Sequence, residues 1–301
     1  MRAVQIDRFG GLDELRLVEV PEPVAGDGEV LVRVVASAVN PVDDKTRSGG
    51  IGEGTPPVPM TLGWELAGVV VEPGTSGLAV GERVFGMVHQ LETGRGTWAD
   101  LVAVAAGSIA RAPGSISLAE AAGLPLPGLT ALQTLDWLEV GPGDRVLVAG
   151  AAGAVGGLAV QLATARGAHV DGLVARPEQV AVVQGLGARS ATTDVSELRA
   201  GGYDAVFDTF GAFVVDAVAD GGRYASIATQ AGMVPDLSHR GVRTTVHQVR
   251  EDGLGLALLA AAVDGGGLRV RVDSQYGLQQ VRAAHERFHQ GGLSGKVVLT
   301  F

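Results

Sequence analysis

The chain of 301 residues contains no cysteine. Disulfide bonds, a catalytic thiolate and cysteine-ligated zinc each need a cysteine sulfur, so all three are excluded. This absence limits the chemistry that the chain can perform, because one common way of polarising a carbonyl uses zinc bound by cysteine and histidine.

Other absences bear on the location and the partners of the protein. No apolar run reaches the roughly 18 residues that suggest a membrane span, and residues 1–11 lack the apolar core of a secretory signal. Basic residues are outnumbered, with 23 Lys and Arg against 33 Asp and Glu, and the formal charge is −10. Such a charge argues against nonspecific binding to nucleic acid. We therefore expect a soluble, cytoplasmic protein with no nucleic-acid or membrane partner.

The residues that are present predict a folded protein of two domains. Hydrophobic residues make up 46% of the chain and charged residues 19%, which is a globular composition. The first third has short β-branched runs separated by Gly, Pro and acidic residues, and Pro113 and Gly114 end this part. The strands predicted there cover residues 3–6, 15–20, 30–38, 66–72, 83–88 and 98–104.

After this boundary, helices are predicted at 117–123 and 129–138, and strands then alternate with helices. The predicted strands are 145–149, 169–174, 204–208 and 222–227, and the helices between them are 155–166, 177–186 and 211–219. Alternation with short connections favours a parallel, doubly wound sheet. Helices at 255–263 and 278–290 and a strand at 296–301 follow, and we expect this last strand to return to the first domain.

The segment 146–163, VLVAGAAGAVGGLAVQLA, is the most informative part of the chain. A strand runs into a turn of small residues that opens directly into a helix. Small residues let the backbone approach a dinucleotide pyrophosphate, and the helix N-terminus stabilises its charge. The G-x-G-x-x-G fingerprint is present here as Ala151-x-Gly153-x-x-Gly156, with its first glycine replaced.

The end of the second strand of this unit indicates which cofactor is bound. A carboxylate there selects NAD by binding the ribose 2′-hydroxyl, whereas a nearby arginine accommodates the 2′-phosphate of NADP. This chain has the apolar Val174 at that place and Arg176 two residues later, while Asp171 lies too early in the strand. The sequence therefore favours NADPH, although Arg176 is also consistent with a solvated loop arginine.

Several further segments keep a common order and spacing along the chain. They are VNPVD at 39–43, LGWELAGVV at 62–70, VGERVFG at 80–86, GTWAD at 96–100, LPLPGLTAL at 124–132, VFDT at 206–209, GGR at 221–223 and GKVVL at 295–299. With the glycine turn, they resemble the medium-chain dehydrogenase/reductase superfamily, in particular its zinc-independent, quinone oxidoreductase-like branch.

The resemblance implies an α/β protein with a GroES-like, β-rich catalytic domain and a Rossmann domain with a doubly wound parallel sheet. The first domain is expected at residues 1–112, completed by 265–301, and the NADPH-binding Rossmann domain at 113–264. Trp64 stands where zinc-dependent relatives have a metal-binding histidine. The expected activity is hydride transfer from NADPH to a quinone or an α,β-unsaturated carbonyl, with no metal ligands at the site.

Four residues are catalytic candidates by this resemblance. Asn40 would orient the nicotinamide carboxamide or the acceptor carbonyl, although Asn before Pro41 also favours a turn. Asp43 matches a family aspartate, and capping of the following helix explains it equally well. Relatives often carry an aromatic residue, usually tyrosine, directly after this aspartate, whereas this chain has Asp44. Asp44, Lys45 or water would then have to protonate an enolate.

The other site candidates lie along the expected cofactor path. Thr130 matches a threonine beside the nicotinamide ribose, or marks an ordinary helix start. A family tyrosine near the 2′-phosphate is replaced by Asp194. The cofactor-binding candidates are Pro41, Thr130, Ala152, Gly153, Ala154, Val155, Gly156, Ala175, Arg176, Thr209, Ile227, Ala228 and Lys296.

Two other interpretations of the function remain open. The chain is also consistent with a non-catalytic NADPH-binding protein of the crystallin type, or with a tailoring enoyl reductase of a biosynthetic pathway.

His285 and His289 are spaced i, i+4 on a predicted helix, but their polar neighbours favour a solvated face over a metal site. A homodimer is expected, with residues 242–249 as the edge strand through which the Rossmann sheet is extended.

Overall fold

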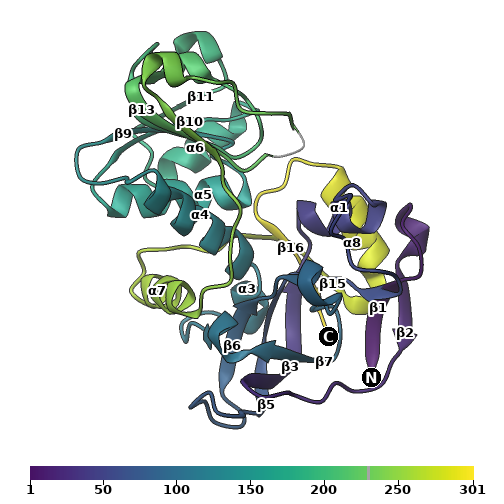
Figure 1. Cartoon of the computed structure of the whole chain (residues 1–301). Helices are drawn as coiled ribbons and strands as arrows, with labels where there is room; N and C mark the ends of the chain where they lie inside the picture. Colours follow the sequence, from purple (N-terminus) through teal and green to yellow (C-terminus); the bar gives the residue numbers. More distant parts are fainter. Residues whose placement is uncertain (229–230) are drawn as a thin grey trace. The chain divides into compact units, whose positions relative to one another are not determined.

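The computed structural model describes residues 1–228 and 231–301, which divide into two units (Figure 1). The first unit consists of Met1–Leu126, Arg250–Gly266 and Val270–Phe301. The second consists of Pro127–Val249 and Gly267–Arg269. Each unit has its own main sheet, in agreement with the predicted change from a β-rich to an alternating α/β pattern.

The first unit is formed mainly by β-strands. Its strands are β1 (Arg2–Ile6), β2 (Arg16–Glu19), β3 (Glu29–Ala38), β4 (Met60–Thr61), β5 (Glu65–Glu72), β6 (Arg83–Met87), β7 (Leu101–Ala105), β8 (Ile109–Arg111), β15 (Val272–Gly277) and β16 (Lys296–Thr300). Its helices are α1 (Pro41–Ser48), α2 (Gln90–Thr93), α3 (Leu118–Ala121), α7 (Gly253–Asp264) and α8 (Val281–His289), with 3₁₀ turns η1 (Leu12–Glu14), η2 (Ala106–Ser108) and η7 (Leu278–Gln280). All six strands predicted in the first third are therefore confirmed.

The strands of this unit form a seven-stranded sheet and a smaller sheet of three strands. The order in the larger sheet is β15-β16-β3-β5-β6-β8, with β7 also pairing with β3, and the smaller sheet has the order β2-β1-β4. The C-terminal strand β16 pairs antiparallel with β3, with Val298 opposite Ala38. The predicted return of the last strand to the first domain is thus confirmed.

The second unit has a six-stranded parallel sheet. Its strands are β9 (Arg145–Ala149), β10 (His169–Leu173), β11 (Ser190–Thr192), β12 (Tyr203–Asp208), β13 (Val218–Ser226) and β14 (Arg243–Val246), and its helices are α4 (Pro125–Trp137, which begins in the first unit), α5 (Ala154–Ala165) and α6 (Glu178–Gly185), with 3₁₀ turns η3 (Val195–Glu197), η4 (Val215–Ala217) and η6 (Ser238–Arg240). The strand order β11-β10-β9-β12-β13-β14 is the 3-2-1-4-5-6 order of the Rossmann fold. Ligands of such sheets bind at the carboxyl ends of the strands, where the order reverses between β9 and β12.

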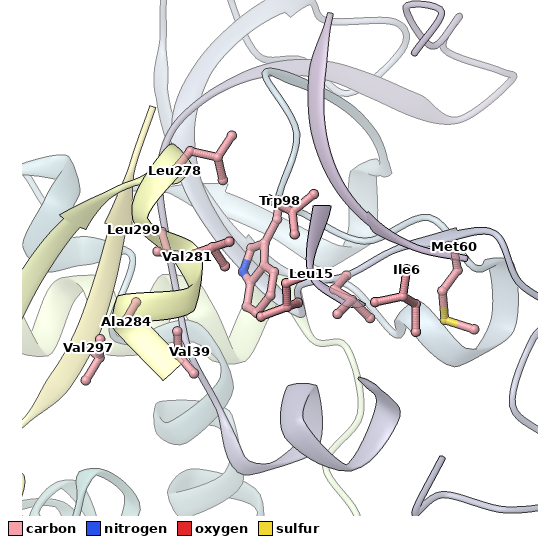
Figure 2. Packing of buried hydrophobic residues seen from close by; sticks show 12 residues of the cluster. Ile6, Leu15, Val39, Met60, Trp98, Leu278, Val281, Ala284, Val297 and Leu299 are labelled. Atoms are coloured by element: carbon pink, nitrogen blue, oxygen red, sulfur yellow. The ribbon is translucent and has the colours of Figure 1, made fainter. Parts of the chain in front are cut away.

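A core around Trp98 holds α8 against the β-strands of the first unit (Figure 2). Ile6 and Met60 come from the small sheet, Val281 and Ala284 come from α8, and all are buried with the Trp98 ring. These apolar contacts fix the rotation of α8, and with it the direction of every polar side chain on that helix.

The predicted helix at 211–219 is wrong. The carboxylate of Asp208, at the end of β12, accepts hydrogen bonds from the backbone N–H groups of Gly211 at 2.8 Å and Phe213 at 2.9 Å, and also binds those of Phe210 and Ala212. The hydroxyl of Tyr224 donates to the same carboxylate at 2.7 Å. Because one side chain takes these N–H groups, the segment forms a loop, and only the short turn η4 precedes β13.

The division into units differs from the predicted boundaries at 112/113 and 264/265. Helix α7 belongs to the first unit, and Asp264 at its end accepts hydrogen bonds from the backbone of Gly114 and Ser115. A Cβ added to Gly253 would lie 2.7 Å from the carbonyl oxygen of Gly107, so a glycine permits this close approach. These contacts explain why the segment 250–264 folds with the β-rich part.

Within the described ranges, no helix is both long and apolar enough to cross a membrane.

Candidate active site

The ends of three neighbouring strands in the first unit bring three polar residues together. Strand β16 begins at Lys296, β5 begins at Glu65, and β3 ends just before Asn40. Since β16 and β5 flank β3 on its two sides, these residues meet although they lie far apart in the sequence. All three are buried, with 5% or less of each residue exposed.

These residues form a closed network of hydrogen bonds. The Lys296 ammonium lies 2.9 Å from Glu65 Oε1, and it also donates to the Val39 carbonyl at 3.0 Å and to Asn40 Oδ1. Asn40 Nδ2 donates to Glu65 Oε1 at 2.9 Å, and the backbone N–H of Leu126 donates to Glu65 Oε2 at 2.8 Å. A buried charge is tolerated only when it is paired and hydrogen-bonded, and this network meets that condition.

Asn40 and Asp43 also form the N-terminus of α1. Asn40 is the N-cap residue and Pro41 is the first helical residue, where its missing N–H costs nothing. The backbone N–H of Asn40 donates to Asp43 Oδ2 at 2.8 Å, so Asp43 does cap the helix. Complete burial raises the pKa of Asp43 to about 8, against the effect of that hydrogen bond and of the Lys296 charge. Asp43 is therefore mostly protonated at neutral pH.

The pKa of each of the next two residues of α1 is lowered, for different reasons. Burial acts to raise the pKa of Asp44, but hydrogen bonds from Arg47 and His289 outweigh it, and the pKa lies below its usual value. Asp44 is thus an ionised hydrogen-bond acceptor rather than a proton donor. Burial lowers the pKa of the Lys45 ammonium, which makes this ammonium a stronger acid. Of these two predicted proton donors, Lys45 is the one whose environment suits the role.

The glycine turn of the second unit lies between β9 and α5, at the end of the sheet expected to bind ligand. Gly150 has a φ of +78°, which a glycine adopts without strain. A Cβ added to Gly156 would lie 2.2 Å from the carbonyl oxygen of Gly150, so only glycine lets the helix approach the turn this closely. Gly153 is the N-cap of α5. This turn fits a dinucleotide pyrophosphate. The fingerprint expects a glycine at position 151, and the neighbouring Gly150 supplies the flexible backbone instead.

The predicted cofactor residues fall into both units. Arg176 follows β10, its side chain is 48% exposed, and its ion pair with Glu178 is long at 4.0 Å. Thr209 Oγ1 donates to the Ala149 carbonyl at 2.7 Å and so fastens the chain after β12 to the end of β9. The remaining predicted residues of the second unit are Thr130, buried in α4, then Ala152, Ala154, Val155, Ala175, Ile227 and Ala228, which lie in the glycine turn, at the start of α5 or just after strands β10 and β13.

Two further predicted cofactor residues, Pro41 and Lys296, belong to the first unit. The Lys296 ammonium donates to Asn40 Oδ1 and the Val39 carbonyl and pairs with Glu65. Asp171 accepts hydrogen bonds from Ser190 and Tyr203 within the second unit, and Asp194 caps η3 by accepting from the Ser196 N–H at 2.8 Å.

Sequence reasoning missed Glu65 and misjudged His285. Glu65 is a single carboxylate at the start of an otherwise apolar strand, and this isolation is the signal that could have identified it. His285 was expected on a solvated face, but it is fully buried on α8, whereas His289 is exposed as predicted. The apolar stripe of Val281 and Ala284 continues through His285, which explains its burial.

Comparisons with known proteins agree across the chain. A family profile described as "Alcohol dehydrogenase GroES-like domain" matches residues 26–114, and one described as "Zinc-binding dehydrogenase" matches residues 185–299. An "NADPH-dependent alkenal/one oxidoreductase, chloroplastic" of Arabidopsis thaliana is 33% identical over 99% of this chain and 79% of its own. A "Quinone oxidoreductase" of Lama guanicoe is 30% identical over 99% of this chain and 97% of its own.

A solved structure is similar over the same extent. The "quinone oxidoreductase from Coxiella burnetii" is 29% identical, with a TM-score of 0.88 over 100% of this chain and 99% of that chain. The likeness therefore includes both units and their connections.

The zinc that one profile description implies does not fit the residues of this chain at the expected place. Trp64 precedes Glu65 where a histidine ligand would stand, its ring lies edge-on to the His89 ring at 5.0 Å, and the sequence has no cysteine. Among the residues that the structure describes, the one group of three side chains spaced for a metal ion includes none of Trp64, Glu65 and His89.

Lys296→Met tests the buried network. The substitution leaves the Glu65 carboxylate without its counter-charge, and we expect the free energy of unfolding to fall by about 3–5 kcal/mol. Lys45→Met, which removes a half-buried lysine of the same unit, should lower it by less than about 1 kcal/mol. Both values come from denaturant-induced unfolding.

The double variant Glu65→Gln, Lys296→Met serves as the internal control. It should recover part of the loss, because neither charge is then left alone in the core. Equal losses for Lys296→Met and Lys45→Met would contradict the account of the network.

Proposed function

Because the chain belongs to the zinc-independent, quinone oxidoreductase-like branch of the medium-chain dehydrogenase/reductase superfamily, we propose that it reduces quinones or α,β-unsaturated carbonyls with NADPH. The observation that carries this proposal is a glycine turn built for a dinucleotide in a chain without the family's zinc ligands. A bound nicotinamide supplies a hydride, and an acceptor activated by conjugation needs no Lewis acid to accept it.

NADPH is proposed over NADH because of the residues that follow β10. Val174 is buried and apolar, so no carboxylate at that position binds a ribose 2′-hydroxyl or repels a 2′-phosphate. Arg176 is exposed, its ion pair with Glu178 is long, and its guanidinium can form two parallel hydrogen bonds to a phosphate.

The first unit contributes the protein's own part of the chemistry. The Glu65–Lys296 pair holds the Asn40 amide in one orientation, because both atoms of the pair bind it directly. Asn40 in turn begins α1, and this helix carries Lys45. Lys45 is the proposed donor of the proton that completes reduction of an enone after the hydride has reached the β-carbon.

Steady-state oxidation of NADPH with a panel of quinones and enones tests the function. We expect turnover of at least one acceptor class by the wild-type chain. Lys45→Met should lower kcat for an enone by about 100-fold or more, since a positioned general acid contributes this much. The Kd for NADPH should stay unchanged.

Ser48→Ala, at an exposed residue of the same helix, is the control and should keep the wild-type kcat. Tight NADPH binding without turnover of any acceptor would contradict the proposed function. Normal enone turnover by Lys45→Met would instead show that water donates the proton. The proposed reduction of enones and quinones would then still hold.

Arg176→Ala tests the cofactor preference. Loss of its charged hydrogen bonds to a 2′-phosphate should raise KM for NADPH by about 10- to 100-fold and leave KM for NADH unchanged. Arg189→Ala is the matched control, because this exposed arginine precedes β11 and so lies at the opposite end of the strands. Equal changes for the two cofactors would contradict the assignment of Arg176.

We also propose that the chain forms a homodimer through β14. This strand is the edge of the six-stranded sheet, and its Val246 is exposed, so a second copy can add its own β14 across a two-fold axis. Light scattering should give the dimer mass at micromolar concentration. Val246→Lys should shift it to the monomer, whereas Val80→Lys, at an exposed valine of the first unit, should not. A wild-type monomer would remove this proposal.

A further inference from the structure

Helices α1 and α8 place three metal-ligating side chains together in the first unit. His285 and His289 lie one turn apart on α8, and Asp44 lies on α1. The Nε2 atom of His289 is 2.9 Å from Asp44 Oδ1, and the Nδ1 atom of His285 is 4.0 Å from it. One ligand atom from each residue lies within 4.8 Å of the other two.

The burial of His285 is not explained by its 4.0 Å contact with Asp44, because burial lowers the pKa of this imidazole to about 4 and leaves the ring neutral. His285 is 0% exposed, and within the described part of the chain neither of its ring nitrogens has a hydrogen-bond partner. Its ring lies edge-on to that of Trp98, at 5.4 Å between centroids. Figure 2 shows Trp98 and the apolar side chains around it. A buried polar group without a partner is costly, so its retention needs a cause. The Asp44–His289 contact accounts for those two residues but leaves His285 unsatisfied.

We propose that Asp44, His285 and His289 bind a divalent transition-metal ion, with Zn²⁺ as the best match. Two imidazole nitrogens and one carboxylate oxygen form a ligand set that zinc accepts in tetrahedral geometry. With zinc–ligand bonds of about 2.1 Å, neighbouring ligand atoms lie roughly 3.4 Å apart. The observed separations from Asp44 Oδ1 are 2.9 and 4.0 Å, and all three ligand atoms lie within 4.8 Å of one another, so side-chain rotations can complete the site.

The surroundings supply an open side and a supporting contact. His289 is exposed and Asp44 is partly exposed, so an ion can enter from solvent and keep water as its fourth ligand. Arg47 donates to Asp44 Oδ1 and to the Gly10 carbonyl. It thereby orients the carboxylate, while its positive charge weakens the affinity for a cation.

A metal ion at this place cross-links α1 to α8. Helix α1 also carries Lys45 and begins at the Asn40 network, so the ion stabilises the helix on which the proposed proton donor lies. This site is separate from the family's zinc position at Trp64, and the hydride transfer proposed above does not require it.

Zinc titration of the tag-free, chelator-treated full chain tests the proposal. Isothermal titration calorimetry with ZnCl₂ should show one saturable site per chain. His289→Ala should weaken Zn²⁺ binding at least 10-fold, and this exposed residue can be removed without disturbing the core. Asp44→Asn should weaken it to a similar degree. His239→Ala, at an exposed histidine of the second unit, should bind Zn²⁺ within twofold of the wild type.

Binding of Co²⁺ gives an independent readout of the ligands. The wild-type chain should show visible absorption bands of four- or five-coordinate Co²⁺, and the His289→Ala chain should lose them. Absence of saturable Zn²⁺ binding by the wild type would overturn the proposal. Binding that His289→Ala retains in full would also overturn it, since the ion would then lie elsewhere.

Discussion

The buried ion pair between Glu65 and Lys296 is the constraint on which the first unit depends. Neither charge is tolerated in the core without the other, so β5 and β16 must both lie beside β3 with their ends aligned. The chain's last strand therefore belongs with its first hundred residues. Asn40 completes the pair through both ends of its amide, and α1 starts from that residue. The position of Lys45 and Asp44 follows from this start.

The second unit depends on close backbone approach instead of charge. Gly150 and Gly156 allow α5 to lie close to the turn after β9. The Asp208 carboxylate accepts hydrogen bonds from the backbone N–H groups of the loop after β12. Both features lie where the strand order reverses, which is the place for a dinucleotide in this fold.

Much of this architecture could be predicted from the sequence. The β-rich first third, the strands from 145 to 208 and the edge strand near 243 have strong local patterns, and the structure contains them. The helix at 211–219 could not be judged from its own residues, because the cause of the loop is the Asp208 side chain outside it. Glu65 and Lys296 show their roles only through contacts between distant strands. His285 was misjudged because its polar neighbours on α8 point away from the core that buries it.

The central claim is that hydride passes directly from a nicotinamide to a conjugated acceptor without help from a metal ion. Reduction of an enone by the His289→Ala chain, with NADPH deuterated at the transferable C4 position and in the presence of a strong chelator, tests it most directly, because this chain lacks a ligand of the proposed metal site. The account predicts one deuterium at the β-carbon of the product and an unchanged rate with the chelator. Product without deuterium, or activity lost on chelation and restored by Zn²⁺, would contradict it.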